Sequence, residues 1–429
     1  MKLSATAAGL FGDGLDARTI AVGGAEAAQT GSAIAAMNSN PAALSGSSQN
    51  QFEVNLGGTY VDADFDRTRG GNAHFNRWSA YIPAAAIAIA GPKNFPVHFG
   101  LAVLPDFMAE VDWRYRDVPG GLGGLTSYGE QTNRSRIISL RTNIGLSVAV
   151  SRWFSIGASG GAIYSEDRLH APYIFQSQPV LAGFKTLLDL QADGFGPAFN
   201  FGAQFRPTDK LTIGLSYRPK TVLHSSGNAS GNASAQLQAL GRGFALVDPN
   251  FEYEAEVRTV MPQVASIAVE WQAWPRLRVI GGFDWIDWSD AFDRLVINLK
   301  HGSNPAINGV VGSDFMTDIA PLHWRDQFVP RAGLEFAVTD QIKLRGGYSY
   351  ARSVVPSSTL SPLNAAIFEH KLSLGAGYQN GRYHTDLAWL WALPVTEHIG
   401  QSALLDGEYS NSSIRVTQHS FQWTAGIDF

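Results

Sequence analysis

The string Gly157-Ala158-Ser159-Gly160-Gly161 is the most enzyme-like feature of the sequence, because it matches the nucleophile elbow of serine hydrolases. That motif requires a sharp turn from a strand into a helix, whereas this string lies in the middle of a predicted strand, so we interpret it as a chance match. The ten histidines show no metal-ligand spacing, and cysteine is absent, which excludes disulfides and thiolate chemistry. We therefore expect no enzymatic activity, no metal and no cofactor.

Cationic side chains are the other residues that could do chemistry, because a ligand carboxylate held away from water needs a cation or several hydrogen-bond donors. Residue alternation places five such cations on one face of their strands, namely Arg141, Arg218, Arg331, Arg345 and Lys371. Among these, Arg141, Arg331 and Arg345 are the candidate partners of a carboxylate. The alternative is that the cations pair with acids of the protein itself, for which Glu335 and Glu369 are available.

The elements that position these residues are strands, because apolar and polar residues alternate with a period of two over long segments. The last segment, Val416 to Phe429, shows the pattern clearly, since Phe421, Trp423 and Ile427 alternate with polar or small residues. The segments beginning near 195, 211 and 342 repeat it. A soluble β-sandwich could alternate in the same way, so this pattern does not decide between a sandwich and a barrel.

The connections between the strands alternate regularly between short and long, and this favours a membrane barrel. Outer-membrane barrels combine short periplasmic turns, long outer loops and an even number of strands, so the connections predict an all-β, fourteen-stranded antiparallel transmembrane barrel. Short turns are expected at 91–96, 151–152, 207–210, 274–276, 339–340 and 380–381, and long connections at 63–76, 106–135, 167–186, 226–258, 299–324, 352–367 and 395–415.

Composition agrees with a barrel in the bacterial outer membrane. Charged residues make up only 16% of the chain and glycine is abundant, with 45 residues. The longest nearly apolar run, Tyr81 to Gly91, is far shorter than the roughly 20 residues of a spanning helix. A net charge of −5 gives no reason to expect a nucleic acid as partner.

The first fifty residues lack strand alternation and consist largely of small residues. Short helices are expected near Asp16–Ile20 and Gly31–Met37. We interpret residues 1–50 as a hatch, or plug, inside the barrel formed by residues 51–429. The alternative is a disordered periplasmic tail, which the apolar composition disfavours.

Three N-terminal motifs resemble the hatch of the FadL family of outer-membrane transporters for long-chain fatty acids and other hydrophobic compounds. These motifs are Gly14–Arg18 (GLDAR), Val22–Ala25 (VGGA) and Asn40–Leu44 (NPAAL). The segment Phe99–Pro105 is similar to the strand that follows the hatch in this family, and the terminal Phe429 is similar to the aromatic end of many outer-membrane proteins.

The resemblance implies a hatch-plugged barrel in which ligand binds among the outer loops and leaves sideways through a gap where the third strand kinks. The expected gate residues are Asn40, Pro41, Ala42, Gly100 and Pro105. This chain has Asp106-Phe107-Met108 where a Phe-Gly pair is frequent in the family, which leaves the position of the kink open. The alternative for Pro105 is that it ends the strand at the outer rim.

Two of the expected long connections, 106–135 and 167–186, are rich in apolar residues, and exposed apolar patches often mark binding surfaces. The alternative is that the two loops pack against each other. The candidate groove residues are Phe107, Met108, Leu122, Leu125, Tyr173, Phe175, Leu181 and Phe184.

The sequence therefore predicts a monomeric, passive outer-membrane transporter of hydrophobic molecules, with long-chain fatty acids as first choice of ligand and the surrounding lipid as a partner. The alternative ligands are aromatic or alkane hydrocarbons, for which the lumen cations would have no role. An aqueous porin and a lipid hydrolase using Ser159 are less favoured.

Overall fold

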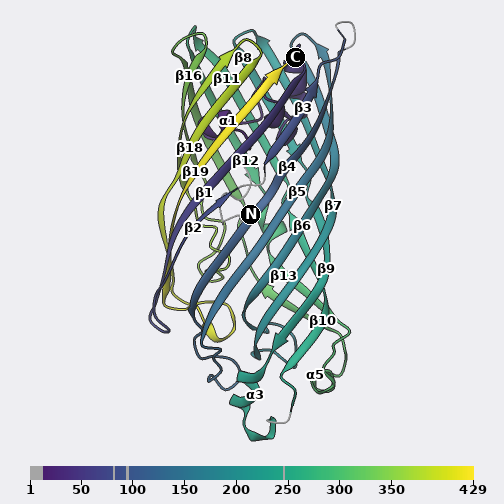
Figure 1. Ribbon diagram of the computed structural model, residues 1–429, viewed down its shortest axis with the longest axis vertical. Helices are drawn as coiled ribbons and strands as arrows, with labels where there is room; N and C mark the ends of the chain where they lie inside the picture. Colours follow the sequence, from purple (N-terminus) through teal and green to yellow (C-terminus); the bar gives the residue numbers. More distant parts are fainter. Residues whose placement is uncertain (1–12, 81–82, 93–95, 245–246) are drawn as a thin grey trace.

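The strands of the chain close into one antiparallel barrel of fourteen wall strands (Figure 1). A computed structural model describes residues 13–80, 83–92, 96–244 and 247–429. The barrel closes where the last strand, β19 (Ser412–Asp428), pairs with the first, β1 (Gln51–Arg67), from Gln51 opposite Asp428 to Arg67 opposite Ser412. The predicted all-β, fourteen-stranded antiparallel barrel is confirmed.

Nineteen labelled strands in the described part of the chain form these fourteen wall strands, because five wall strands are each divided into two labelled pieces. The divided wall strands are β2 (Ala73–Ala80) with β3 (Ala84–Ile89), β8 (Leu211–Arg218) with β9 (Thr221–Asn232), β10 (Asn250–Met261) with β11 (Val264–Trp274), β12 (Leu277–Ile286) with β13 (Arg294–Lys300), and β14 (Met316–Pro321) with β15 (Gln327–Ala337). The others are β4 (Val97–Arg116), β5 (Glu130–Ser151), β6 (Phe154–Ile174), β7 (Lys185–Thr208), β16 (Ile342–Tyr350), β17 (His370–Asn380) and β18 (Tyr383–Ile399).

Alternation explains the two faces of the wall. In the first half of β4, Phe99, Leu101 and Val103 are exposed on the outside. Ala102 and Leu104, which alternate with them, are buried on the inside. Apolar side chains on the outer face are what a wall in contact with lipid requires. None of the described helices is long and apolar enough to cross a membrane.

The connections have the predicted short-and-long alternation, but several strands are longer than the sequence suggested, so most of the long connections are shorter. The connection expected at 106–135 spans 117–129, and the one expected at 167–186 spans 175–184. The reason is visible in β6, where buried Ser165 and Asp167 alternate with the more exposed Glu166 and Arg168. Because both faces are polar there, hydrophobic alternation fails to reveal the strand.

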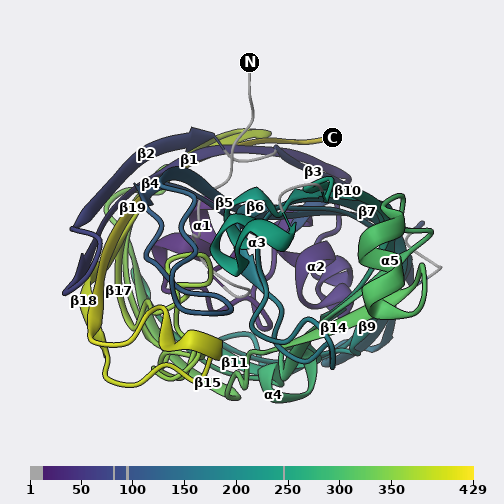
Figure 2. The ribbon, with the colours of Figure 1, turned by 90° about the horizontal axis from the view of Figure 1, so that it is seen from below.

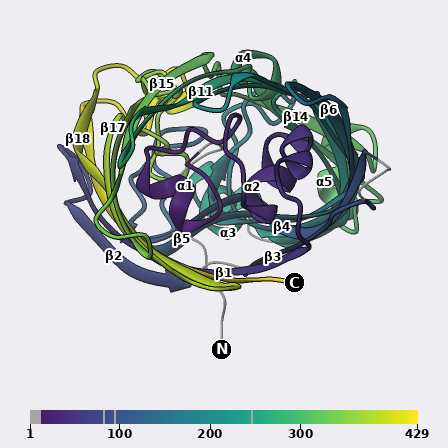
Figure 3. The ribbon, with the colours of Figure 1, turned by 90° about the horizontal axis from the view of Figure 1, so that it is seen from above.

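Short helices lie in the interior and in the outer connections. Figures 2 and 3 show that α1 (Ala17–Ala21) and α2 (Ala33–Asn38) lie within the ring of strands. The 3₁₀-helix η1 (Pro41–Gly46) follows α2. The long connections carry α3 (Ser234–Leu240), η2 (Arg242–Phe244), α5 (Pro305–Val311) and η3 (Leu405–Gly407), whereas α4 (Trp288–Ala291) lies between β12 and β13, the two pieces of one wall strand.

Local sequence explains the three N-terminal helices, because each begins at a side chain that caps it. Asp16 accepts a hydrogen bond from the backbone N–H of Thr19, Ser32 from that of Ala35, and Asn40 from that of Ala42. The two predicted helices therefore exist within a residue or two of their expected positions. Residues 1–12, the start of the predicted hatch, lie outside the described residues.

Candidate functional site

The N-terminal segment, residues 13–50, packs against glycines on the inner face of the wall. At each of these positions an added Cβ atom would approach an atom of the segment closer than 3.0 Å. Glycine thus allows the segment and the wall backbone to come into close contact. This close approach accounts for part of the high glycine content. The inward glycines are Gly100, Gly145, Gly157, Gly202, Gly214, Gly282, Gly333, Gly347 and Gly375.

The Asn40-Pro41-Ala42 motif is fixed to the wall by hydrogen bonds. The Nδ2 of Asn40 donates to the carbonyl of Ala203 on β7 at 3.1 Å and to that of Ala27 within the segment at 2.6 Å. The carbonyl of Ala42 accepts hydrogen bonds from Ser147 on β5 and Ser155 on β6, at 3.1 and 3.2 Å. Pro41 stands in the first turn of η1, where its missing N–H costs nothing.

The third wall strand, β4, contains a β-bulge directly after Pro105, where its register with β5 shifts between Pro105 and Phe107. A bulge inserts one extra residue and so moves the following odd-numbered residues to the opposite face. Phe107, Trp113 and Tyr115 are accordingly buried, whereas Val103 before the bulge is exposed. The alternative that Pro105 ends the strand is therefore wrong, since β4 continues to Arg116.

Past this bulge no ladder joins the second and third wall strands within the described part of the chain. β3 pairs with β4 only from Ile89–Phe99 to Ala85–Val103, and no ladder joins β2 to β4 among the described residues. The strands are nevertheless close, because Arg77 of β2 lies 3.5 Å from the carboxylate of Asp112 of β4. Arg77 lies on the inner face of β2, together with buried Phe75, whereas Asp112 lies on the outer face of β4, together with exposed Arg114. Because a side chain from the inner face of β2 contacts one from the outer face of β4, β4 lies closer to the interior than β2 here.

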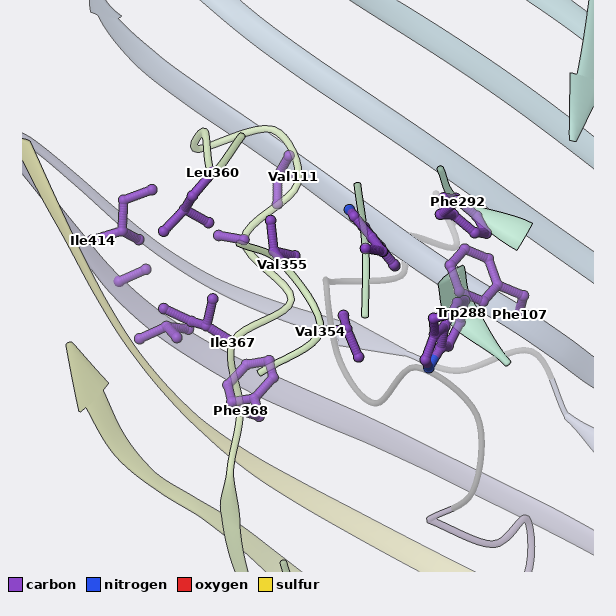
Figure 4. Packing of buried hydrophobic residues seen from close by; sticks show 14 of the residues in the cluster. Phe107, Val111, Trp288, Phe292, Val354, Val355, Leu360, Ile367, Phe368 and Ile414 are labelled. Atoms are coloured by element: carbon purple, nitrogen blue, oxygen red, sulfur yellow. The ribbon is translucent and has the colours of Figure 1, made fainter. Parts of the chain in front are cut away.

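Toward the outer end, the barrel contains an apolar pocket of about 250 Å³. Its lining comes from β4, β5, β6, β13 and β14, from the connections 351–369 and 400–411, and from Gln176, Phe292, Leu322 and Trp324. A cluster of buried apolar side chains adjoins the pocket. Figure 4 shows Phe107, Trp288 and Phe292 on one side of this cluster and Val354, Leu360 and Phe368, from the connection 351–369, on the other. Trp113 of β4 donates its Nε1–H to the carbonyl of Pro362 in that connection at 3.1 Å.

The structure brings together only part of the predicted groove. Phe107, Met108 and Tyr173 line the apolar pocket, but they lie on β4 and β6 rather than on loops. Phe175, Leu181 and Phe184 instead pack in a separate apolar cluster, Leu122 lies against Gly183, and Leu125 is exposed. The apolar residues of the connection 175–184 therefore pack mainly against neighbouring strands, and Leu122 beside Gly183 is a contact of the kind expected if the two loops packed against each other.

The sequence predicted a long connection at 352–367 but did not assign it to the binding site. In the structure this connection spans 351–369 and supplies seven residues of the pocket lining. Val354, Leu360 and Ile367 in it are fully buried. The signal was present, because this stretch is as apolar as the two loops that were singled out. The lining residues that it contributes are Thr359, Ser361, Leu363, Asn364, Ala365, Ala366 and Phe368.

The three candidate carboxylate partners face inward as expected, and each is engaged by groups of the protein. Arg331 lies 2.7 Å from Asp284 and donates to the carbonyl of Gly23, while Arg345 lies 2.7 Å from Glu335 and also contacts Asp386. Lys371 likewise binds Asp13. The other expected acid, Glu369, accepts a hydrogen bond from the N–H of Ser353 at 3.2 Å.

Arg141, the third candidate, joins the N-terminal segment to the bulge of β4. Its Nη2 donates to the side chain of Asn38 at 2.7 Å, and its Nε lies 3.3 Å from the carboxylate of Asp106, the extra residue of the bulge. Arg218 contacts the same Asp106 oxygen at 3.2 Å and donates to the carbonyl of Asn38 at 3.0 Å. Two guanidinium groups and one carboxylate thus hold the segment and the bulge together.

A second, more polar cavity of about 150 Å³ lies between the N-terminal segment and the wall. Met108 lines both this cavity and the apolar pocket, so the two spaces adjoin at the bulge of β4. Ser159 lies within β6 and accepts a hydrogen bond from Asn143, not in a strand-to-helix turn. The described residues contain no group of His, Asp and Glu arranged to hold a metal ion.

The outer rim of the apolar pocket carries a buried carboxyl group, that of Glu408. The side chain is 10% exposed, and burial raises the pKa of Glu408 to about 7, even though the Lys185 ammonium 4.0 Å away and Arg67 lower it. Asp117 and Asp406 also raise it. The adjoining connections are fastened to each other, because Asp406 accepts a hydrogen bond from the N–H of Gly121 and Lys185 binds Asp117 at 2.5 Å.

The raised pKa of Glu408 predicts that the stability of the connection 400–411 at the pocket rim depends on pH. A folded-state pKa above the ordinary value means that the protonated carboxyl stabilises the packed arrangement below about pH 4.5, and that this stability is lost as the pH rises through about 7. Amide hydrogen exchange in residues 400–411, corrected for its intrinsic rate, should therefore be faster at about pH 8.5 than at about pH 5. The variant Glu408→Gln should abolish the difference; an unchanged difference in it would contradict the assignment to Glu408.

A closed barrel with an outward apolar face, an occupied lumen and an apolar pocket near its outer end is typical of an outer-membrane transport protein. The sequence profile of the outer membrane protein transport family (OMPP1/FadL/TodX) matches residues 3–391, so the chain belongs to this family and is located in the bacterial outer membrane. Members of the family are transport channels for hydrophobic compounds, not enzymes. A comparison with curated protein sequences gives no match.

Solved structures with the same fold cover almost the whole chain. A FadL homologue of Pseudomonas aeruginosa has a TM-score of 0.74 and 18% identity, covering 98% of this chain and 100% of its own. The toluene transporter TodX of Pseudomonas putida has a TM-score of 0.73 and 20% identity, covering 97% and 99%. The toluene transporter TbuX of Ralstonia pickettii has a TM-score of 0.71 and 18% identity, also covering 97% and 99%. At these identities the likeness shows the fold alone.

Proposed function

We propose that the chain takes up hydrophobic small molecules passively and releases them sideways into the membrane between β2 and β4. The observation that carries this proposal is the bulge after Pro105. It moves the apolar residues of β4 into the lumen, where they line the pocket, and it coincides with the absence of a β2–β4 ladder in the described residues.

A sideways exit is favoured energetically. A hydrophobic molecule that left the lumen for the aqueous periplasm would re-expose its surface, at a cost of about 0.8 kcal/mol per CH₂ group. Passage between β2 and β4 would place it in lipid instead, so no such cost arises. The ligand would be captured in the apolar pocket and would pass Met108, which lines both cavities.

The N-terminal segment would act as a hatch on this route. Its position within the ring of strands and its hydrogen bonds to β5, β6 and β7 support this role. Within it we assign Asn40, Pro41 and Ala42 to the gate. In the wall, Pro105 precedes the bulge, and Gly100 makes room for the side chain of Met37 on α2.

Two substrate classes fit this architecture, long-chain fatty acids and aromatic or alkane hydrocarbons. TodX and TbuX, which share the fold, are toluene transporters. The two classes differ chiefly in the carboxylate of the fatty acid. The charges along the route therefore bear directly on the choice between them.

Nothing in the pocket requires a second copy of the chain, and we propose that a monomer is the functional unit.

Cross-linking of introduced cysteines tests the sideways exit. Because the sequence contains no cysteine, the cross-linker reacts only with the introduced pair. The double variant Arg77→Cys/Asp112→Cys joined by a short bis-maleimide should lose most of its uptake of a labelled hydrophobic ligand, relative to the same variant before cross-linking. The matched control is Arg136→Cys/Arg168→Cys, which joins residues that already face each other in the β5–β6 ladder. Full uptake by the cross-linked β2–β4 variant would refute lateral release there.

A further inference from the structure

The described residues that line the apolar pocket include carboxylates but no cation. Among its described lining residues, Glu110 and Glu408 are acidic, and there is no lysine or arginine. Glu110 is buried and lies 3.6 Å from Arg77. Neighbouring tyrosine, serine, threonine and amide groups supply dipoles but no positive charge. An anionic ligand would therefore enter a poorly hydrated space with two acids and no counter-ion in the lining.

The described lining of the polar cavity, further along the route, also has more acidic than basic residues. Its described lining contains one cation, Arg218, against four acids, which are Asp13, Glu26, Asp106 and Asp284. Arg218 is engaged, since it contacts Asp106 at 3.2 Å and the carbonyl of Asn38 at 3.0 Å. The inward cations outside this lining that the sequence singled out are also paired with acids of the protein.

We propose that the route selects uncharged hydrophobic molecules and rejects carboxylates, and that Glu408 is the residue that determines this specificity at the outer pocket. This inference rests on the proposed uptake function and narrows its substrate class to neutral compounds, such as hydrocarbons and long-chain alcohols. Fatty-acid anions, the first choice from the sequence, are then poor substrates.

Glu408 is singled out by its surroundings. It lines the apolar pocket and is only 10% exposed, so water screens it little. The one ammonium group near it, that of Lys185 at 4.0 Å, is fully buried and binds Asp117 at 2.5 Å and the carbonyl of Val118 at 2.9 Å. Lys185 is thereby held away from the pocket lining. Arg67, the other cation that acts on Glu408, is also absent from the described lining, so within the pocket a ligand carboxylate beside Glu408 would meet repulsion with no cation in contact to offset it.

A matched pair of ligands isolates the charge. Initial uptake of labelled hexadecanol and of labelled hexadecanoate would be measured at about pH 8, above the pKa of about 7 of Glu408, so that this carboxyl is charged. The cells would lack their own hydrophobic-compound channels and express the full chain. We expect the alcohol to enter about tenfold faster than the carboxylate, which corresponds to ~1.4 kcal/mol. In Glu408→Gln the ratio should fall to about threefold or less, because the repelling charge is gone. Heat-modified electrophoretic mobility would show that each variant is folded.

The control is Glu252→Gln, which removes an exposed carboxylate on β10 outside the pocket and should leave the ratio unchanged. Equal or faster uptake of hexadecanoate by the native chain would overturn the inference while leaving the uptake function intact. An unchanged ratio in folded Glu408→Gln would overturn the role of Glu408. Uptake of neither ligand above the empty-vector level would instead count against the proposed function itself.

Discussion

Replacing Gly157 by alanine should displace the Asn40–Ala42 motif from the wall and make the barrel conduct ions. The new Cβ atom would lie closer than 3.0 Å to backbone atoms of Pro41 and Ala42, which cannot move aside as a flexible side chain could. Overpacking of this kind typically costs about 1–3 kcal/mol. Planar-bilayer recordings should show larger and more frequent openings than the native chain, and thermal unfolding should begin at a lower temperature.

The matched control for this prediction is Gly160→Ala on the same strand. There the added Cβ would meet the ring of Phe199 at 3.4 Å and the carbonyl oxygen of Ala198 at 3.9 Å, which are ordinary contact distances. We expect native conductance and stability from it. If Gly157→Ala conducted no better than Gly160→Ala, the N-terminal segment would not be the barrier in the lumen. If the native chain already showed large, steady openings, an aqueous porin would be the better description.

Replacing Asp106 by alanine should both destabilise the protein and reduce uptake. Arg141, whose side chain is 2% exposed, would lose its carboxylate partner, and Arg218 would lose the same one. Breaking a buried ion pair by removal of one partner typically costs about 3–5 kcal/mol, because the remaining charge is left uncompensated. Since both arginines also bind Asn38, the N-terminal segment should loosen together with the bulge.

Denaturant unfolding in detergent would measure the loss of stability, and labelled-ligand uptake would measure the loss of function. Asp209→Ala removes a carboxylate from the exposed turn between β7 and β8 and should change neither. The double variant Asp106→Ala/Arg218→Ala should be less destabilised than the sum of its single variants, because the two residues share one network. A stable, active Asp106→Ala protein would show that these ion pairs do not hold the bulge.

Much of the barrel could be predicted from the sequence because its signals are local. Strands such as 416–429 carry their alternation in consecutive residues, and the short turns that separate strands are equally local. The caps Asp16, Ser32 and Asn40 likewise act within three residues. Even so, the outer halves of the strands escaped prediction, because polar residues occupy both of their faces.

The candidate site was harder to predict because it depends on contacts between distant segments. Pro105 suggested an irregular strand, but only the register with β5 places the bulge at Asp106 and reverses the facing of Phe107 and Trp113. Alternation correctly predicted that Arg141 faces inward. Its partners Asn38 and Asp106, however, come from other parts of the chain and could not be predicted from this local pattern. Which residues of the connections 175–184 and 351–369 reach the pocket is likewise decided by tertiary packing.

The inward glycines restrict how this barrel and its N-terminal segment can be recombined with those of relatives. Each removes a side chain where one particular atom of the segment touches the wall, such as the side chain of Met37 at Gly100 or the backbone of Ala27 at Gly214. A segment transplanted from another barrel would present its bulk at different positions and would meet side chains there. Exchange of the two parts in a chimera therefore requires that the segment and its set of wall glycines be transferred together.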